Sequence, residues 1–160
     1  MNGPSRSGPD RSAWLLTLLL LLTAGCASSR SLPPVDLQAS GWTIQETAAA
    51  WKPRREAPEL LGELLVAHHA DGSRFVQFSK QGLPVVTAQL TPERWQITSS
   101  LRKGRYGGRR PAPGQILWFR LDSLPPNALW PAPWQLTQDP SGSWSLLQTR
   151  TGERLEGAAN

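Results

Sequence analysis

Short runs of residues suited to a pleated sheet, each closed by a turn signal, are the feature that most limits how this chain can fold. Polar and apolar side chains alternate strictly over residues 94–98, which predicts a strand with one wet and one buried face. The turn at 70–73 separates two β-prone runs, 64–67 and 74–78, and predicts a hairpin. A second hairpin is predicted where residues 134–137 and 144–146 flank the turn at 139–142.

Three further segments complete the expected fold. Residues 43–52 carry apolar side chains near helical spacing together with three alanines, which predicts a helix that ends before Pro53. The apolar run 115–124 fits either a buried strand or a short helix, and the pair Thr151-Gly152 is suited to turn the chain into 154–156. The expected fold class is α+β, mostly antiparallel β, with a curved sheet or incomplete barrel and one or two helices.

The chain length and the cysteine count limit how this fold is held together. A chain of 160 residues allows one domain, and a single cysteine excludes both an intrachain disulfide framework and a cysteine-based zinc cluster. Side-chain packing must therefore stabilise the domain.

The first residues are typical of an export signal. Arg6 and Arg11 form a basic start, residues 13–22 are almost uninterruptedly apolar, and small residues follow at 23–25. As a helix, residues 13–25 would reach only about 20 Å, short of the ~30 Å core of a bilayer. We therefore expect a removable signal over residues 1–25 rather than a membrane span.

The residue after this signal is Cys26. The run Leu22-Thr23-Ala24-Gly25-Cys26 resembles the lipobox of bacterial lipoproteins, although Thr23 stands where leucine is more usual. The resemblance implies that the thiol receives a diacylglycerol, that further acylation such as palmitate follows, and that Cys26 becomes the new N-terminus. Ala27 in place of Asp implies sorting to the outer membrane. The alternative is a soluble export signal that happens to carry a cysteine.

The segment after Cys26 predicts the domain boundaries. Residues 26–40 are small and polar and contain Pro33-Pro34, which predicts a flexible tether. One mostly antiparallel β domain is expected over 41–160.

No catalytic, metal or cofactor site is expected from the motifs. His68 and His69 are adjacent, and neighbouring residues of a strand point to opposite faces. The chain lacks a nucleophile elbow, a His-Glu-x-x-His helix, a phosphate-binding glycine loop and a recognisable pair of carboxylates. We therefore expect a protein that is not an enzyme.

The mature chain is rich in tryptophan. These side chains either fill the interior or line an apolar cavity. For the second alternative, the expected cavity residues are Val86, Trp95, Ile97, Trp118 and Trp134.

Residues 101–114 form a segment with five basic side chains and no acidic one, which predicts an exposed, mobile loop. The loop either serves solubility or contacts anionic lipid head groups, since each Lys or Arg near such a surface adds about 1 kcal/mol of attraction. Export makes a nucleic-acid partner unexpected. The five basic residues are Arg102, Lys103, Arg105, Arg109 and Arg110.

The layout of residues 42–155 resembles the Lol family of lipoprotein carriers and receptors. The resemblance rests on an expected N-terminal helix that bears tryptophan, on hairpins that include Phe75-Val76-Gln77-Phe78 and Trp95-Gln96-Ile97, on an apolar segment ending at Leu124-Pro125, and on a last hairpin at Trp134 and Trp144. The resemblance implies an incomplete barrel that binds acyl chains in an apolar hollow. We expect a lipoprotein of the cell envelope, anchored in the outer membrane and facing the periplasm, with an acyl chain or another lipoprotein as partner. The alternative is an adaptor that binds another envelope protein through a sheet edge or an aromatic patch.

Overall fold

A computed structural model describes residues 31–124, 126 and 129–158, and the structural statements below concern these residues. The chain divides into two compact units, and the second, Ser31–Asn160, contains all of them. The predicted signal and Cys26 lie outside the described residues.

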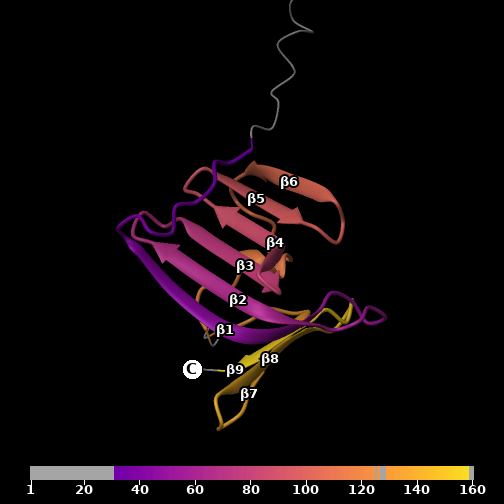
Figure 1. Cartoon of the computed structure of the whole chain (residues 1–160). Coiled ribbons are helices and arrows are strands. Elements are labelled where there is room, and N and C mark those ends of the chain that lie inside the picture. Colours follow the sequence, from indigo (N-terminus) through magenta and orange to yellow (C-terminus); the bar gives the residue numbers. More distant parts are fainter. Residues whose placement is uncertain (1–30, 125, 127–128, 159–160) are drawn as a thin grey trace, which may run out of the picture. The chain divides into compact units, whose positions relative to one another are not determined.

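The described unit is built on one antiparallel sheet of nine strands (Figure 1), in the order β6-β5-β4-β3-β2-β1-β9-β8-β7. Strands β1 to β6 follow one another as a meander, and β7 to β9 add to the free side of β1. The strands are β1 (Trp42–Lys52), β2 (Leu60–His69), β3 (Arg74–Lys80), β4 (Leu83–Leu90), β5 (Arg94–Ser99), β6 (Gly104–Arg109), β7 (Trp134–Gln138), β8 (Ser143–Gln148) and β9 (Arg154–Ala158).

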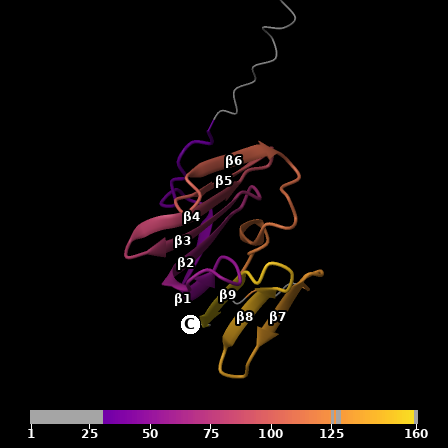
Figure 2. The same ribbon diagram turned by 90° about the vertical axis from the view of Figure 1, so that its right-hand side faces the viewer.

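One face of this sheet, here called the inner face, carries the core. Thr47, Ala49 and Trp51 alternate on this face of β1 and are buried. The chain that connects β6 to β7 packs against this core through the short 3-10 helix η1 (Leu117–Phe119). Figure 2 shows η1 as the short coil in this connection. The strand residues of the core cluster are Ala49, Trp51, Leu64, Val66, Val76, Phe78, Val85, Val86, Ala88, Leu90, Trp134, Trp144, Leu146 and Leu155.

The predicted hairpins are confirmed. As predicted, β2 pairs with β3 and β7 pairs with β8, both antiparallel. Strands β4 and β5 form a further antiparallel pair. The turn at Gly152, where φ is +72°, leads into β9 as expected. The antiparallel, curved-sheet part of the expected fold class is therefore confirmed.

The helix predicted over 43–52 is wrong, because these residues form β1. This strand pairs with β2 from Trp42 to Trp51 and with β9 from Ala49 to Lys52. Backbone pairing on both sides outweighs the weak helical preference of three alanines. Among the described residues η1 is the only helical segment, and it answers the open question of residues 115–124 in favour of a short helix.

The mobile loop predicted over 101–114 is also wrong in its central part, which forms β6. The strand has no bulky side chain at Gly108, where an added Cβ would lie 3.1 Å from Nε1 of Trp95. That Nε1 donates a hydrogen bond to the carbonyl oxygen of Arg109 at 3.0 Å. The glycines that suggested a loop therefore allow β6 to approach Trp95 closely.

The described part of the predicted tether contacts the sheet. The backbone N–H of Leu32 donates to Oε1 of Gln96 at 2.9 Å, and Nε2 of Gln89 donates to the carbonyl oxygen of Pro33 at 3.3 Å. Residues 31–40 form no strand or helix, but they cross from β5 to the start of β1 (Figure 1) instead of extending freely. Because Gln89 and Gln96 point away from the core, this segment lies on the opposite face, here called the outer face.

Candidate functional site: an outer-face groove and an arginine-bearing edge

The five residues expected to line a cavity are packed together on the inner face. Val86, Trp118 and Trp134 are almost fully buried, and Trp95 and Ile97 pack against the same core. Trp118 meets the ring of Trp51 edge to face with 5.0 Å between ring centroids. These side chains therefore pack as part of the core on the inner face.

An open groove of about 620 Å³ lies instead over β1, β2, β8 and β9. Side chains on the outer face supply most of its wall, and Leu61 is the largest apolar one, with 68% of its surface exposed. The residues that line the groove are Ala48, Ala49, Ala50, Leu61, Gly62, Thr137, Asp139, Ser143, Trp144, Ser145, Glu156, Gly157 and Ala158.

Small residues where β1 meets β9 give this groove its depth. The register between the two strands covers only Ala49–Lys52 and Arg154–Gly157, and beyond it the hydroxyl of Thr47 donates to the carbonyl oxygen of Ala158 at 2.6 Å. A Cβ at Gly157 would lie 2.5 Å from the indole of Trp144. The close approach of β9 to Trp144 thus requires glycine, and alanine on the outer face of β1 leaves room above the sheet.

The rim of the groove is polar and acidic. Asp139 accepts hydrogen bonds from the backbone N–H groups of Ser141 at 2.8 Å and Ser143 at 3.2 Å. The Ser141 side chain is the main cause that lowers the pKa of Asp139. The groove therefore joins an apolar floor to an ionised carboxylate at its edge. Sequence analysis does not indicate this groove, because the alanines of β1 favour a helix when they are considered alone.

The structure separates the five predicted basic residues along the β5–β6 hairpin. Arg102 and Lys103 lie in its turn, Arg105 and Arg109 lie within β6, and Arg110 follows the strand. All five are exposed. The five residues are therefore spread along the β6 edge of the sheet and are not gathered in one loop.

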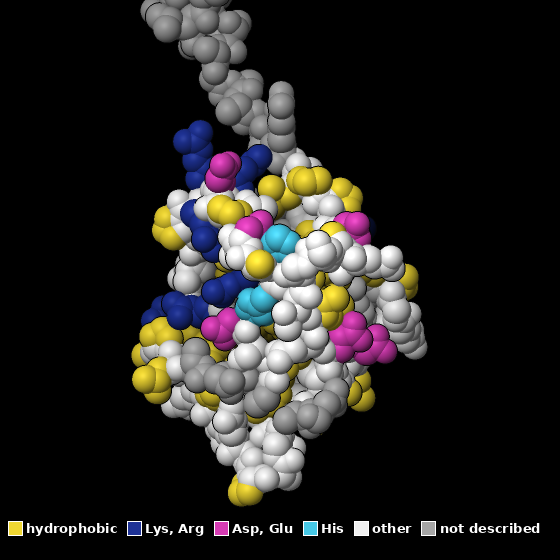
Figure 3. Space-filling model, turned by 90° about the vertical axis from the view of Figure 1, so that its left-hand side faces the viewer, with side chains coloured by type: hydrophobic (Ala, Val, Ile, Leu, Met, Phe, Trp, Pro, Cys, Tyr) yellow, Lys and Arg dark blue, Asp and Glu magenta, His cyan; other side chains and the backbone are white. Residues whose placement is uncertain are grey.

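Sequence reasoning missed one member of this edge. Arg94 is the register partner of Arg109, so the two guanidinium groups leave the same face of neighbouring strands. Figure 3 shows Lys and Arg side chains (dark blue) gathered on part of the side that also carries both histidines (cyan). In the sequence, Arg94 is only one polar position of an alternating strand. The pairing of β5 with β6 places Arg109 directly beside it.

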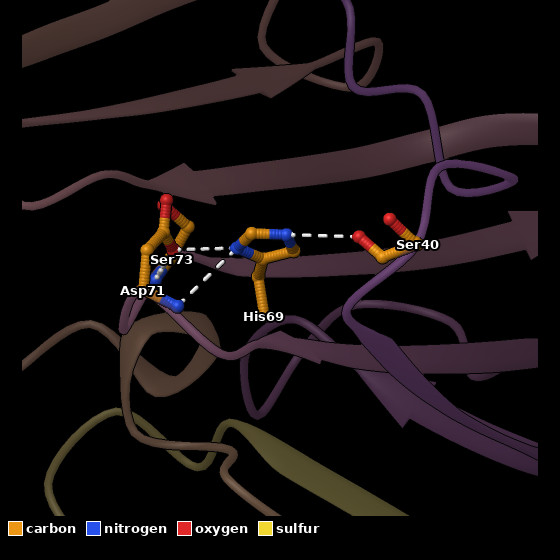
Figure 4. A network of polar contacts seen from close by, with 4 residues as sticks. All are labelled: Ser40, His69, Asp71 and Ser73. Atoms are coloured by element: carbon orange, nitrogen blue, oxygen red, sulfur yellow. Dashed lines mark hydrogen bonds and ion pairs between the residues drawn. The ribbon is translucent and has the colours of Figure 1, made fainter.

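A polar network holds the outer-face segment to the β2–β3 turn (Figure 4). Nδ1 of His69 lies 2.9 Å from Oδ1 of Asp71, and its Nε2 lies 3.2 Å from the carbonyl oxygen of Ser40. The hydrogen bond from the backbone N–H of Ser73, and after it the hydrogen bond from His69, lower the pKa of Asp71 to about 2. The hydrogen bond to Asp71 raises the pKa of His69. A protonated His69 can thus donate hydrogen bonds to both Asp71 and the carbonyl oxygen of Ser40. This network ties the residue 31–40 segment to the β2–β3 turn, so the role of His69 is structural.

His68 lies on the other face of β2, as predicted. Burial lowers its pKa, and the charge of Arg74 adds to this effect. Within the described part of the chain, no group of three or more His, Cys, Asp and Glu residues is placed to hold a metal ion. No helix formed by the described residues is both long and apolar enough to cross a membrane.

Comparisons with protein-family models, with curated proteins and with solved structures found no match to this chain. The lipobox and the Lol-like layout therefore depend on the residues quoted for them.

Proposed function

We propose that this protein is a non-catalytic, lipid-anchored protein of the cell envelope that binds one apolar chain, such as the acyl chain of a lipid or lipoprotein, in the outer-face groove. The observation that carries the proposal is the groove of about 620 Å³ with an alanine floor and the exposed Leu61. Its volume falls within the range of about 300–1,000 Å³ that is usual for small-molecule sites. The inner face, by contrast, is occupied by packed aromatic side chains.

The proposed anchor is the acylated Cys26, in the outer membrane and facing the periplasm. The lipobox-like run before Cys26 supports this location. Two or three acyl chains bind a bilayer far more firmly than one, because each buried CH₂ contributes about 0.8 kcal/mol. Such an anchor would keep the groove close to a membrane that supplies acyl chains.

A matched pair of leucines tests the groove. Leu61 and Leu83 are similarly exposed, at 68% and 71%, but only Leu61 lines the groove. We expect Leu61→Ser in the full-length chain to weaken binding of a fluorescent fatty acid about tenfold, since burying a leucine contributes about 1.5–3 kcal/mol. Leu83→Ser should leave the affinity unchanged.

A second variant tests the same site by filling it. Ala48→Phe places a large side chain over the groove floor and should abolish probe binding while the fold is retained, because Ala48 is exposed. Equal affinity of the wild type, Leu61→Ser and Ala48→Phe would refute the groove as the binding site.

The adaptor alternative is supported by the two ends of the sheet. Strands β6 and β7 each pair on one side only among the described strands, so each presents unpaired backbone groups. A strand of another envelope protein could add to either edge. Capture of one envelope protein by a chain that does not bind the fatty-acid probe would favour the adaptor.

A further inference from the structure

The outer face of the β5–β6 hairpin carries three arginines that form no ion pair with an acidic side chain among the described residues. Arg94 and Arg109 are direct register partners, and Arg105 lies on the same face of β6. The ion pairs among the described residues join His69 to Asp71 and Arg154 to Glu59 and Glu156, and none includes these three arginines. Glu93, the neighbour of Arg94 in the chain, is exposed and makes none of these pairs.

The cross-strand pair of like charges requires an explanation. Side chains of directly opposite residues start about 5 Å apart, and like charges at that spacing destabilise a sheet. Within the part of the chain that the structure describes, no carboxylate forms an ion pair with Arg94 or Arg109 that would relieve this repulsion. An anion bound between the two guanidinium groups would turn this repulsion into attraction, and the oxygens of a phosphate group match the planar donors of arginine.

On the β6 side the surface between these arginines is exposed at Gly107, while on the β5 side Leu32 contacts Gln96. Gly107 stands opposite Gln96 and carries no side chain between Arg105 and Arg109, which are about 13 Å apart along the strand. The edge beyond β6 is unpaired among the described strands. Several phosphate groups side by side could therefore approach this edge, which suits an extended anionic surface better than one small ion.

The first described residues of the chain contact the same part of the sheet as these arginines. Leu32 is hydrogen-bonded to Gln96, the residue of β5 that lies between Arg94 and Thr98 on this face. Six residue steps separate Cys26 from Leu32, so even a fully extended chain covers at most about 22 Å between them. A lipid on Cys26 would therefore hold the three arginines near the head groups of the bilayer that it enters.

We propose that Arg94, Arg105 and Arg109 form a docking surface for the phosphate head groups of anionic phospholipids, which orients the domain with its β5–β6 edge against the membrane. The inference rests on the proposed anchor at Cys26 and deepens it by naming the lipid class and adding Arg94. It leaves the groove over β1 and β9 on the other half of the sheet, where the β5–β6 edge does not cover it.

The test compares binding of the full-length chain to two kinds of vesicle, phosphatidylcholine alone and phosphatidylcholine mixed with phosphatidylglycerol. The ratio of the two affinities cancels the contribution of the lipid anchor and of any apolar leader. For the wild type we expect a clear preference for the anionic vesicles that falls as salt is added. The triple variant Arg94→Gln, Arg105→Gln, Arg109→Gln should reduce this ratio on the order of 100-fold, about fivefold for each arginine.

A control variant removes the same charge elsewhere. Arg54, Arg55 and Arg150 are exposed and lie in the turns β1–β2 and β8–β9. Their triple replacement by Gln should leave the ratio close to that of the wild type. Equal losses in both variants would show that only net charge matters, and displacement by inorganic phosphate at constant ionic strength would indicate a site for a free anion. Either result would overturn the docking surface.

The experiment separates this inference from the proposed function. A wild-type ratio of one would refute the docking surface while leaving the anchor and the groove untouched. A mature chain that binds neither kind of vesicle would instead contradict the anchor at Cys26.

Discussion

The indole rings of Trp51 and Trp118 meet edge to face with 5.0 Å between their centroids and an interplanar angle of 79°. Trp51 comes from β1 and Trp118 from η1, so this contact joins the sheet to the connection that covers its inner face. Phe78 completes the aromatic group at 5.7 Å from Trp51. These contacts pack the connection against the inner face of the sheet.

Removing one ring from this group should destabilise the domain strongly. We expect Trp118→Ala to lower the free energy of unfolding by about 3–5 kcal/mol, since it leaves a large cavity between buried aromatic side chains. Urea denaturation followed by circular dichroism measures the change. Leu83→Ala, at a leucine that is 71% exposed, is the control and should change the stability by less than about 0.5 kcal/mol. A small loss for Trp118→Ala would indicate that the inner face is hollow.

Gly157→Ala should destabilise the junction of β9 with β8. The added Cβ would lie 2.5 Å from the indole of Trp144, which is 2% exposed and has little room to move. The expected loss in the free energy of unfolding is about 1–3 kcal/mol, the range for overpacking a well-filled site. Thermal unfolding of the variant at neutral pH tests this. An unchanged melting temperature would contradict the packing between β8 and β9.

The two histidines should make opposite contributions to stability as the pH changes. The folded-state pKa of His69 is raised by Asp71, so its stabilising effect is complete below 6.5 and is lost as the pH rises through that raised pKa. Asp71, with a folded-state pKa of about 2, adds stability above its ordinary value of 3.8 that is lost as the pH falls. The wild type should therefore exceed His69→Gln in melting temperature by more at about pH 5.5 than at about pH 8.5.

His68→Gln provides the matched control for this measurement. Burial and Arg74 lower the folded-state pKa of His68, while Asp122 opposes the shift, so protonation of this imidazole destabilises the fold. The advantage of the wild type over His68→Gln should shrink as the pH falls below 6.5. The same pH trend in both variants would contradict the assigned networks.

Replacing Cys26 by Ser should release the protein from the membrane fraction, because serine cannot receive the thioether-linked diacylglycerol that the lipobox implies. Cell fractionation with immunodetection measures the distribution. Circular dichroism of the variant checks that the fold is retained. A Cys26→Ser protein that stays in the membrane fraction with its leader removed would contradict the anchor.

The hairpins could be predicted from the sequence because their signals are local. Alternating side chains and a glycine-containing turn such as the one at Gly72, where φ is +85°, lie within a few residues of each other. Strand β1 could not be predicted in this way, because its partner β9 begins about a hundred residues later in the chain. The alanines of β1 by themselves favour a helix. Strand β6 was hidden for a similar reason, since its glycines are explained only by the ring of Trp95.

The candidate site was less accessible to sequence reasoning than the fold. The five residues expected around a cavity do come together in or against one hydrophobic core, to which η1 contributes Trp118. The groove arises where β1 and β9 separate, and Arg94 gains its importance only from the register with Arg109. Both features depend on pairing between distant segments.

Photo-crosslinking with a diazirine-bearing fatty acid tests the binding proposal most directly, because peptide mass spectrometry then shows which face of the sheet the acyl chain contacts. The account predicts adducts in the full-length chain on the groove residues Ala48, Ala50, Leu61 and Ala158. Adducts concentrated on the inner-face residues Val86, Ile97 and Trp118, or a domain without adducts, would contradict it.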